Sequence, residues 1–137
     1  MAEKNLRELV DLGFQQVGAF SLQSNKLFLR LKNFKENVGA YAFVVDNRIM
    51  YAGITTNSLI ARMNGYKNPG PSQETNKRIK PKIIESNGVT IYFLPKDLVE
   101  KCEIIIKGNQ MEKIIPIDLK TFERITISMF KPPWNNY

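Results

Sequence analysis

Two tyrosine-containing triplets and one arginine carry the strongest chemical signal in this 137-residue sequence. Gly39-Ala40-Tyr41 is followed by Tyr51-Ala52-Gly53, and Arg62 lies in the segment after that. The planar guanidinium of an arginine suits phosphate oxygens, and its charge favours the ionised form of a neighbouring phenol. Two phenols beside a fixed cation therefore indicate a site suited to phosphodiester chemistry.

The chain contains no histidine, which excludes the commonest general base and most zinc sites. Proton transfer must therefore use tyrosine, lysine, arginine or a carboxylate. A free tyrosine titrates near pH ~10, so it is a poor base at neutral pH unless neighbouring cations stabilise its phenolate. Arg62 is the cation that the sequence offers for this purpose.

The charge of the chain favours a polyanionic partner, because 20 basic against 13 acidic residues give a net charge of +7. Nucleic acid is the first expectation and an anionic membrane surface the second. The longest uncharged apolar run, residues 38–45, is far shorter than the ~20 residues that cross a bilayer, so no membrane span is predicted. Cys102 is the only cysteine, which rules out an internal disulfide and fits a reducing cytoplasm.

The length and the 43% hydrophobic content predict one domain with its own core. Residues 3–12 predict an amphipathic helix, and residues 17–31 predict a β-hairpin around Ser24-Asn25. We expect residues 1–37 to form an N-terminal helix and hairpin extension of a core that spans residues 38–137.

A second hairpin, with its loop at residues 46–48, carries Tyr41 and Tyr51. A three-residue loop would pair Phe43 with Tyr51 and place both tyrosines on one face of the sheet, whereas a two-residue turn would place them on opposite faces. Asn47 tolerates the left-handed conformation that a three-residue loop with a bulge requires. The shared face is therefore the expected arrangement.

A helix is predicted from about residue 59 to 66, with Asn57 or Ser58 as its cap. Arg62 and Tyr66 are four residues apart, so they share one side of this helix. Its core-facing residues are expected to be Leu59, Ile60 and Met63.

Further elements follow along the chain. A helix is predicted over residues 81–87, with Pro81 in its first position, and strands over 90–94 and 103–107. Asp118 is expected to cap a last helix, which Pro132-Pro133 ends. The core side of this helix is predicted to hold Leu119, Phe122, Ile125, Thr126 and Met129.

Six elements in this order resemble the GIY-YIG nuclease family, although each triplet has alanine where the family usually has a larger aliphatic residue. The resemblance covers about residues 38–137. It implies a small α/β (α+β) fold with a mainly antiparallel, three-stranded sheet flanked by helices. The matching elements are Gly39-Ala40-Tyr41, Tyr51-Ala52-Gly53, Arg62, Tyr66, Glu123 and, after Pro132-Pro133-Trp134, Asn135.

The resemblance implies an endonuclease that hydrolyses DNA and leaves 5′-phosphate and 3′-hydroxyl ends. Tyr41 is the expected general base, and Arg62 is the expected clamp on the scissile phosphate. Tyr51 and Tyr66 would orient the water and the phosphate.

The resemblance also implies a metal ion. Glu123 would hold one Mg²⁺ or Mn²⁺, with water and phosphate oxygens as the remaining ligands, and the ion would stabilise the leaving oxygen. Asn135 would fix the Glu123 end of the site.

Basic residues gather after the helix that carries Arg62. We expect them to contact phosphates, with a merely solvated face as the alternative. The expected nucleic-acid-binding residues are Lys67, Lys77, Arg78, Lys80 and Lys82. The N-terminal region adds Lys26, Arg30, Lys32 and Lys35, which form either a second DNA clamp or part of a cap on the core.

Two other functions fit the same features. The main alternative is a non-catalytic nucleic-acid-binding module on the same fold, although a pure binder has no need of Glu123. The third is a structural partner that docks an acidic protein on its basic surface. DNA, most simply duplex, is the expected partner, and cutting both strands with one site per chain would need a homodimer or two sequential nicks.

Overall fold

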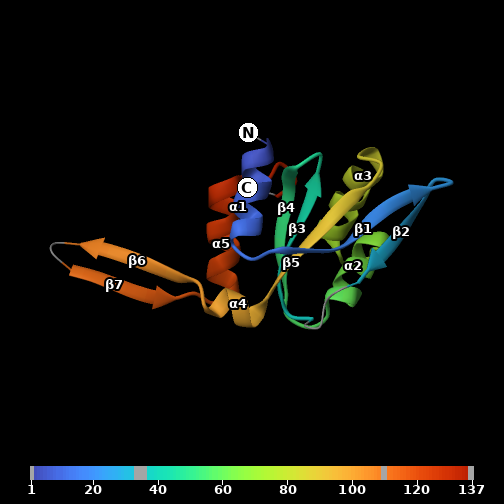
Figure 1. Ribbon diagram of the computed structural model, residues 1–137. Coiled ribbons are helices and arrows are strands. Elements are labelled where there is room, and N and C mark those ends of the chain that lie inside the picture. The colour runs from blue at the N-terminus through green and yellow to red at the C-terminus, as the bar shows by residue number, and fades with distance from the viewer. Residues whose placement is uncertain (1, 33–36, 109–110, 136–137) are drawn as a thin grey trace.

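The computed structural model describes residues 2–32, 37–108 and 111–135. Five antiparallel strands form the main sheet in the order β2-β1-β5-β3-β4, and helices cover both of its faces (Figure 1). β6 and β7, of which only β6 was expected, pair separately as a projecting hairpin. The strands are β1 (Gln15–Gln23), β2 (Lys26–Leu31), β3 (Gly39–Val45), β4 (Arg48–Thr55), β5 (Val89–Pro95), β6 (Glu103–Gly108) and β7 (Met111–Pro116). The helices are α1 (Ala2–Asp11), α2 (Leu59–Lys67), α3 (Glu74–Glu85), α4 (Lys96–Glu100) and α5 (Leu119–Phe130).

The N-terminal hairpin belongs to the main sheet, so the expectation of a three-stranded sheet was wrong. β1 pairs antiparallel with β5, with Phe20 opposite Val89 and Gln15 opposite Phe93. β3 occupies the other edge of β5. Without β1, one edge of β5 would present a row of unpaired backbone groups beside the core. The hairpin therefore completes the sheet.

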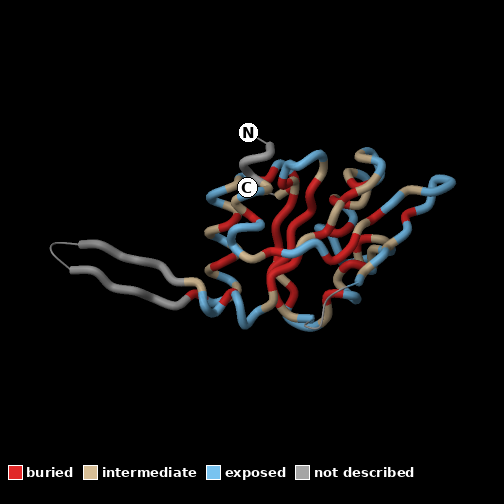
Figure 2. Tube along the Cα trace, viewed as in Figure 1, coloured by how far each residue is buried: buried red, intermediate tan, exposed pale blue. Residues whose placement is uncertain are grey.

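The sheet separates two hydrophobic cores, and its central strands are buried (Figure 2). Residues 40–44 of β3 are all buried, although successive side chains point to opposite faces. The first core lies between the sheet and helices α2 and α3, and it contains aromatic residues of β1, β3, β4 and β5. The second joins residues of α1, α4 and α5 to aliphatic residues of β3, β4 and β5. The first tyrosine triplet thus lies where both faces are covered.

β3 and β4 join through a two-residue turn, not the expected three-residue loop. Asp46 and Asn47 both have positive φ, at 50° and 65°, as in the turns that match the twist of a hairpin. A β-bulge at Met50 then shifts the register by one residue. Because the bulge restores the parity that the short turn reverses, Tyr41 and Tyr51 both face the first core, as expected.

Two helix caps are confirmed and one helix start is corrected. Side-chain oxygens of Ser58 and Asp118 accept hydrogen bonds from N–H groups three residues later, at the starts of α2 and α5. α3 begins at Glu74, so Pro81 lies inside it and does not start it. The side of α3 that faces the core continues at helical spacing on both sides of the proline. Its buried residues are Asn76, Ile79 and Ile83.

Two residues expected in the core are exposed. α2 buries Leu59, Met63 and Tyr66, which follow one side of the helix, and Ile60 on its flank is 48% exposed. Met129 is 57% exposed, because the inner side of α5 runs from Phe122 through Thr126 to the half-buried Phe130. Among the described residues, no helix is long and apolar enough to span a membrane.

Candidate active site

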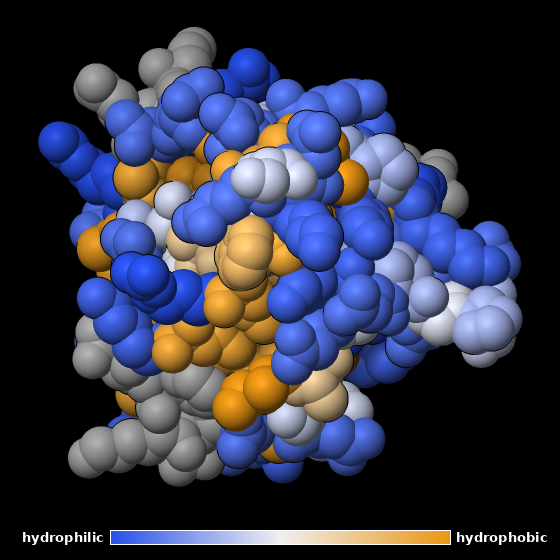
Figure 3. All heavy atoms as spheres, turned by 90° about the vertical axis from the view of Figure 1, so that its right-hand side faces the viewer, coloured by the Kyte–Doolittle hydropathy of each residue, from blue (hydrophilic) through white to orange (hydrophobic). Residues whose placement is uncertain are grey.

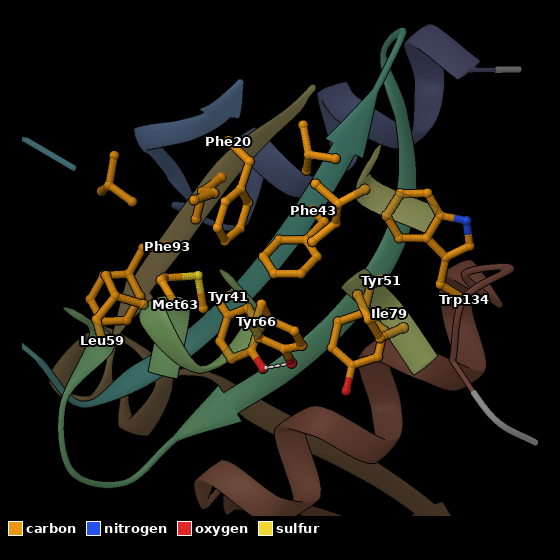
Figure 4. Packing of buried hydrophobic residues seen from close by; sticks show 14 of the residues in the cluster. Phe20, Tyr41, Phe43, Tyr51, Leu59, Met63, Tyr66, Ile79, Phe93 and Trp134 are labelled. Carbon is orange, nitrogen blue, oxygen red and sulfur yellow. Dashed lines mark hydrogen bonds between the residues drawn. The ribbon is translucent and has the colours of Figure 1, made fainter. Parts of the chain in front are cut away.

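Tyr41, Tyr66 and Arg62 form one hydrogen-bonded cluster between β3 and α2. The two phenol oxygens are 2.6 Å apart, which is a short O–H···O hydrogen bond (Figure 4). Arg62 Nε donates to the Tyr41 hydroxyl at 3.1 Å, and Nη2 donates to the Tyr66 hydroxyl at 3.1 Å. The guanidinium carbon also lies 4.9 Å from the centre of the Tyr66 ring. The structure therefore brings together three of the residues predicted from the sequence.

Close contacts explain the glycines of the two triplets. Tyr41 lies opposite Gly53 in the β3–β4 ladder, and a Cβ atom on Gly53 would lie 2.7 Å from the Tyr41 hydroxyl oxygen. A Cβ atom on Gly39 would collide with the carbonyl oxygen of Leu94 on β5. Neither position has room for a side chain. The missing side chain of Gly53 lets the Tyr41 ring pass over β4 toward α2, and the missing side chain of Gly39 lets β3 pair closely with β5.

A third partner of Arg62 was not predicted. Arg62 Nη1 donates to Oδ1 of Asn76 on α3 at 3.2 Å, and Asn76 is buried. A guanidinium has five N–H groups, so these three bonds leave two for a ligand. Asn76 Nδ2 has no hydrogen-bond partner among the described residues. The sequence shows Asn76 only as a polar residue in a helical stripe, which does not reveal this contact.

Burial makes Tyr41 a weaker acid than a free tyrosine. Loss of solvation raises its pKa, the neighbouring Tyr51 raises it further, and the charge of Arg62 and the hydrogen bond with Tyr66 lower it. The net result is a pKa well above the ordinary 10.0. Burial also raises the pKa of Tyr66. Arg62 therefore does not offset burial, contrary to the sequence-based expectation, and both groups are neutral phenols near pH 7.

Tyr51 lies beside the cluster with its hydroxyl uncommitted. Its ring centre is 6.2 Å from the ring centres of both Tyr41 and Tyr66. Within the described part of the chain, its hydroxyl makes no hydrogen bond. Figure 4 shows the three phenol oxygens at the same end of the aromatic cluster. Tyr51 is therefore placed to contact a group that approaches the cluster from that end.

Glu123 on α5 is a half-buried carboxylate with no hydrogen bond or ion pair to the described residues. Burial raises its pKa, while the charges of Lys120, Arg62 and Arg124 oppose the rise. Arg62 therefore acts electrostatically on Glu123 as well as on the two phenols. Across residues 2–32, 37–108 and 111–135, no three acidic, histidine or cysteine residues gather as a metal site. The arrangement fits an ion held by one carboxylate plus water and phosphate oxygens, as Mg²⁺ often is.

Asn135 binds the backbone of β4 and not the cluster. Its Oδ1 accepts from the Ala52 N–H at 2.9 Å, and its Nδ2 donates to the Ala52 carbonyl at 2.9 Å. The Trp134 N–H donates to the Met50 carbonyl at 2.8 Å. The C-terminal segment thus pairs with β4 on both sides of Tyr51. Asn135 positions the strand that carries this tyrosine, whereas the sequence-based expectation placed it beside the metal-binding glutamate.

Two of the five expected nucleic-acid-binding residues are engaged within the protein. Arg78 Nη1 donates to the Trp134 carbonyl at 2.5 Å, so Arg78 holds the C-terminal segment. Lys77 Nζ donates to the Pro71 carbonyl and lies 3.7 Å from a carboxylate oxygen of Glu74. The basic stretch is therefore partly structural. The other expected residues are Lys67, Lys80 and Lys82.

A polar pocket of about 360 Å³ adjoins the cluster. It lies at the N-terminal end of α2, where unpaired backbone N–H groups favour an anion. Arg62 and Asn76 line it, together with the polar side chains of Thr56, Asn57 and Ser58. A phosphate group in this pocket would meet Arg62 directly.

The fold is similar to those of two nucleases. A mutant of bacteriophage T4 EndoII matches with a TM-score of 0.64 and 19% sequence identity, over 96% of this chain and 99% of that chain. Restriction endonuclease HPY188I in complex with product DNA matches with a TM-score of 0.55 and 14% identity, over 88% of this chain and 74% of that chain. No model of a known protein family and no curated protein sequence matches the chain. The structural match to EndoII extends well beyond residues 38–137, to which the sequence resemblance was limited.

Proposed function

We propose that this protein is a DNA endonuclease of the GIY-YIG type that hydrolyses phosphodiester bonds with the help of a divalent metal ion. The hydrogen-bonded cluster of Tyr41, Tyr66 and Arg62 beside a polar pocket carries the proposal. Burying polar and charged groups such as these costs free energy unless they are hydrogen-bonded, so apolar side chains would be the simpler filling if the cluster served only packing. The fold shared with two nucleases supports the assignment.

Arg62 is the proposed clamp on the scissile phosphate. Bonds to Tyr41, Tyr66 and Asn76 fix the plane of its guanidinium, and its remaining N–H groups are available to a phosphate in the adjoining pocket. Donors that are fixed before the reaction stabilise the charge that develops on phosphoryl oxygens. The dipole of α2 adds to this effect at the same pocket.

Tyr41 is the proposed acceptor of a proton from the attacking water. A bond forms between the water oxygen and phosphorus while the bond to the 3′ oxygen breaks, and the departing oxygen takes a proton from solvent, which leaves 5′-phosphate and 3′-hydroxyl ends. Because burial raises the pKa of Tyr41, the phenolate needs further stabilisation before it serves as a base. An ionised Tyr41 can only accept, so Tyr66 would then donate the hydrogen bond between the two phenol oxygens, which are 2.6 Å apart. Tyr51, with its uncommitted hydroxyl, orients the water.

Glu123 is the proposed ligand of one Mg²⁺ or Mn²⁺. When bound, the ion neutralises charge on the leaving oxygen and favours the ionised form of groups beside it. Glu123 fits this role because burial disfavours its negative charge, which a bound cation would offset, and because no described residue pairs with it. Asn135 supports the site through its bonds to the strand that carries Tyr51.

DNA is the proposed substrate. The net charge of +7 favours a polyanion, and the HPY188I neighbour was solved with its product DNA. Lys80 and Lys82 on α3 are the proposed phosphate contacts. A binding module without activity remains the rival, but the half-buried Glu123, which has no partner among the described residues, favours the enzyme, because a pure binder gains nothing from such a carboxylate.

Supercoiled plasmid with Mg²⁺, or with EDTA in place of the metal, tests the proposal. We expect nicked or linear DNA with Mg²⁺ and none with EDTA, and we expect end-labelling to show 5′-phosphates. Glu123→Gln, purified in parallel, controls for contaminating nucleases. Equal cleavage by the wild type and this variant would refute the assigned site, and binding without cleavage would favour the rival.

A further inference from the structure

β2 is an edge strand with a leucine-lined inner side and a basic outer side. Leu27, Leu29 and Leu31 pack in the core beneath α2 and α3. Figure 1 shows the turn of the β1–β2 hairpin extending beyond these helices, and Figure 3 shows this end of the molecule as mainly hydrophilic surface crossed by a hydrophobic strip. The exposed residues that alternate with the leucines, here called the hairpin face, are Lys26, Phe28, Arg30 and Lys32.

The cations of the hairpin face have no acidic neighbour on β1, the strand with which β2 pairs. Its neighbours on β1 are Ala19, Ser21 and Gln23, and residues 12–32 contain no aspartate or glutamate. Lysines on an edge strand also deter pairing between molecules, which alone would account for the cations. That explanation does not account for an exposed aromatic ring in the same row.

Phe28 connects the hairpin face to the candidate active site. Its side chain is 44% exposed, and Lys67 Nζ on α2 lies 5.9 Å from its ring centre. Lys67 follows Arg62 by five residues on this helix, so the two positions are about 7.5 Å apart along its axis. Successive phosphates of one strand in duplex DNA are about 3.4 Å apart along the axis. The rise along α2 from Arg62 to Lys67, which lies beside Phe28, therefore corresponds to roughly two phosphates.

We propose that the hairpin face binds an unpaired nucleic-acid strand that continues from the cleavage site, an inference that rests on the function proposed above. Lys26, Arg30 and Lys32 contact its phosphates, and Phe28 stacks on one of its bases. A base inside a duplex is already stacked and paired, whereas an unpaired base has a free face for an aromatic side chain. The substrate is thus DNA with an unpaired segment next to the cut.

Fluorescence anisotropy without divalent metal tests this proposal, with a labelled oligothymidine strand and a labelled duplex of equal length as probes. Leu98→Ala is the matched control for the aromatic ring, because Leu98 is 39% exposed and lies on α4, which packs against β3 and β5. The two charge variants each remove three exposed cations. They are Lys26→Ala/Arg30→Ala/Lys32→Ala and, as the control, Arg7→Ala/Lys96→Ala/Lys101→Ala.

Phe28→Ala should weaken binding of the single strand by about 5- to 150-fold, the range for one stacked base, with a much smaller effect on the duplex. The hairpin charge variant should reduce the slope of log affinity against log salt on the single strand by about 2, because each phosphate contact contributes about 0.7. Both control variants should bind like the wild type.

The proposal would be overturned if the Phe28→Ala variant bound the single strand as tightly as the Leu98→Ala variant does. Equal losses on both probes would also overturn it, because they would show contact with the backbone alone. If the wild type cleaves plasmid and the hairpin variants bind both probes normally, only the hairpin proposal is lost. A wild type that neither binds nor cleaves overturns both proposals.

Discussion

The hydroxyl oxygen of Tyr41 lies 2.7 Å from the point that a Cβ atom on Gly53 would occupy. The tyrosine thus uses the space of a missing side chain on the neighbouring strand, and this path brings it to Arg62 and Tyr66. Gly53 is not among the glycines with positive φ, so backbone conformation does not require it. Glycine is required at this position because the Tyr41 ring occupies the space of a side chain.

Gly53→Ala should therefore abolish the proposed cleavage while the fold survives. The added methyl group displaces the phenol, and a misplacement of about 1 Å can cost about 100-fold in rate. Overpacking should also lower the free energy of unfolding by about 1–3 kcal/mol, measured by urea denaturation. Gly70→Ala is the control, because its nearest neighbour is a flexible Gln73 atom at 3.4 Å. Full cleavage by Gly53→Ala would show that the position of Tyr41 is irrelevant.

Arg62→Lys should be nearly as damaging as Arg62→Ala. Three nitrogens of Arg62 bond to acceptors on three residues, and a single ammonium cannot reproduce that geometry or the paired contact with phosphate. We expect a loss of about 100-fold or more in single-turnover cleavage. A lysine variant with wild-type rates would reduce Arg62 to a diffuse charge.

Glu123→Gln should abolish cleavage and spare DNA binding, because it keeps the size of the side chain and removes the charge that holds the metal. The wild type should melt at a higher temperature when millimolar Mg²⁺ is added, since a ligand that binds only the folded state stabilises it. The variant should lose this rise. Glu100→Gln, at an exposed ion pair with Lys96, is the control and should keep it.

Local signals in the sequence predicted local structure well. Ser58 and Asp118 are caps because their side-chain oxygens satisfy N–H groups only three residues away. The common face of Tyr41 and Tyr51 was also correct, but for the wrong reason. The expectation depended on a three-residue loop, whereas a bulge at Met50 restores the parity after a two-residue turn. Nothing in the type of residue 50 indicates a bulge.

Contacts between distant elements could not be predicted in the same way. β1 completes the sheet against β5, and nothing in the alternation of either strand names its partner. Asn76 reaches Arg62 only because α2 and α3 pack side by side, and Arg78 reaches Trp134 only because the C-terminal segment runs along β4. Periodicity shows that a helix has a buried side, but the group it meets depends on the packing of the whole core.

The basic residues of α3 should separate into two kinds. Lys80→Ala and Lys82→Ala should each weaken binding to all duplex sequences alike, and each should reduce the salt slope by about 0.9. Arg78→Ala should instead lower the free energy of unfolding by about 1–3 kcal/mol, because the Trp134 carbonyl loses its charged donor. A normal unfolding curve with a reduced salt slope for Arg78→Ala would return this residue to the DNA surface.

Tyr41→Phe is the most direct test of the proposed base. The ring stays over Gly53 and only the hydroxyl is removed, so the protein should fold, bind DNA with near-normal affinity and cleave at least ~100-fold more slowly. Because burial raises the pKa of Tyr41, its ionised fraction grows about tenfold per pH unit below that pKa. Wild-type single-turnover cleavage should therefore rise from about pH 7 to about pH 9, and the rise should vanish in the variant.

Tyr51→Phe completes this test, because its hydroxyl shares no hydrogen bond with the cluster and is proposed only to orient water. It should cost less than Tyr41→Phe and keep the rise in rate with pH. The reverse outcome, with cleavage retained in Tyr41→Phe and lost in Tyr51→Phe, would exchange the two roles. Retention in both variants and in the double variant would remove tyrosine from the proton transfer. Arg62 would then act through the phosphate alone, with its bonds to Tyr41 and Tyr66 serving only to orient it.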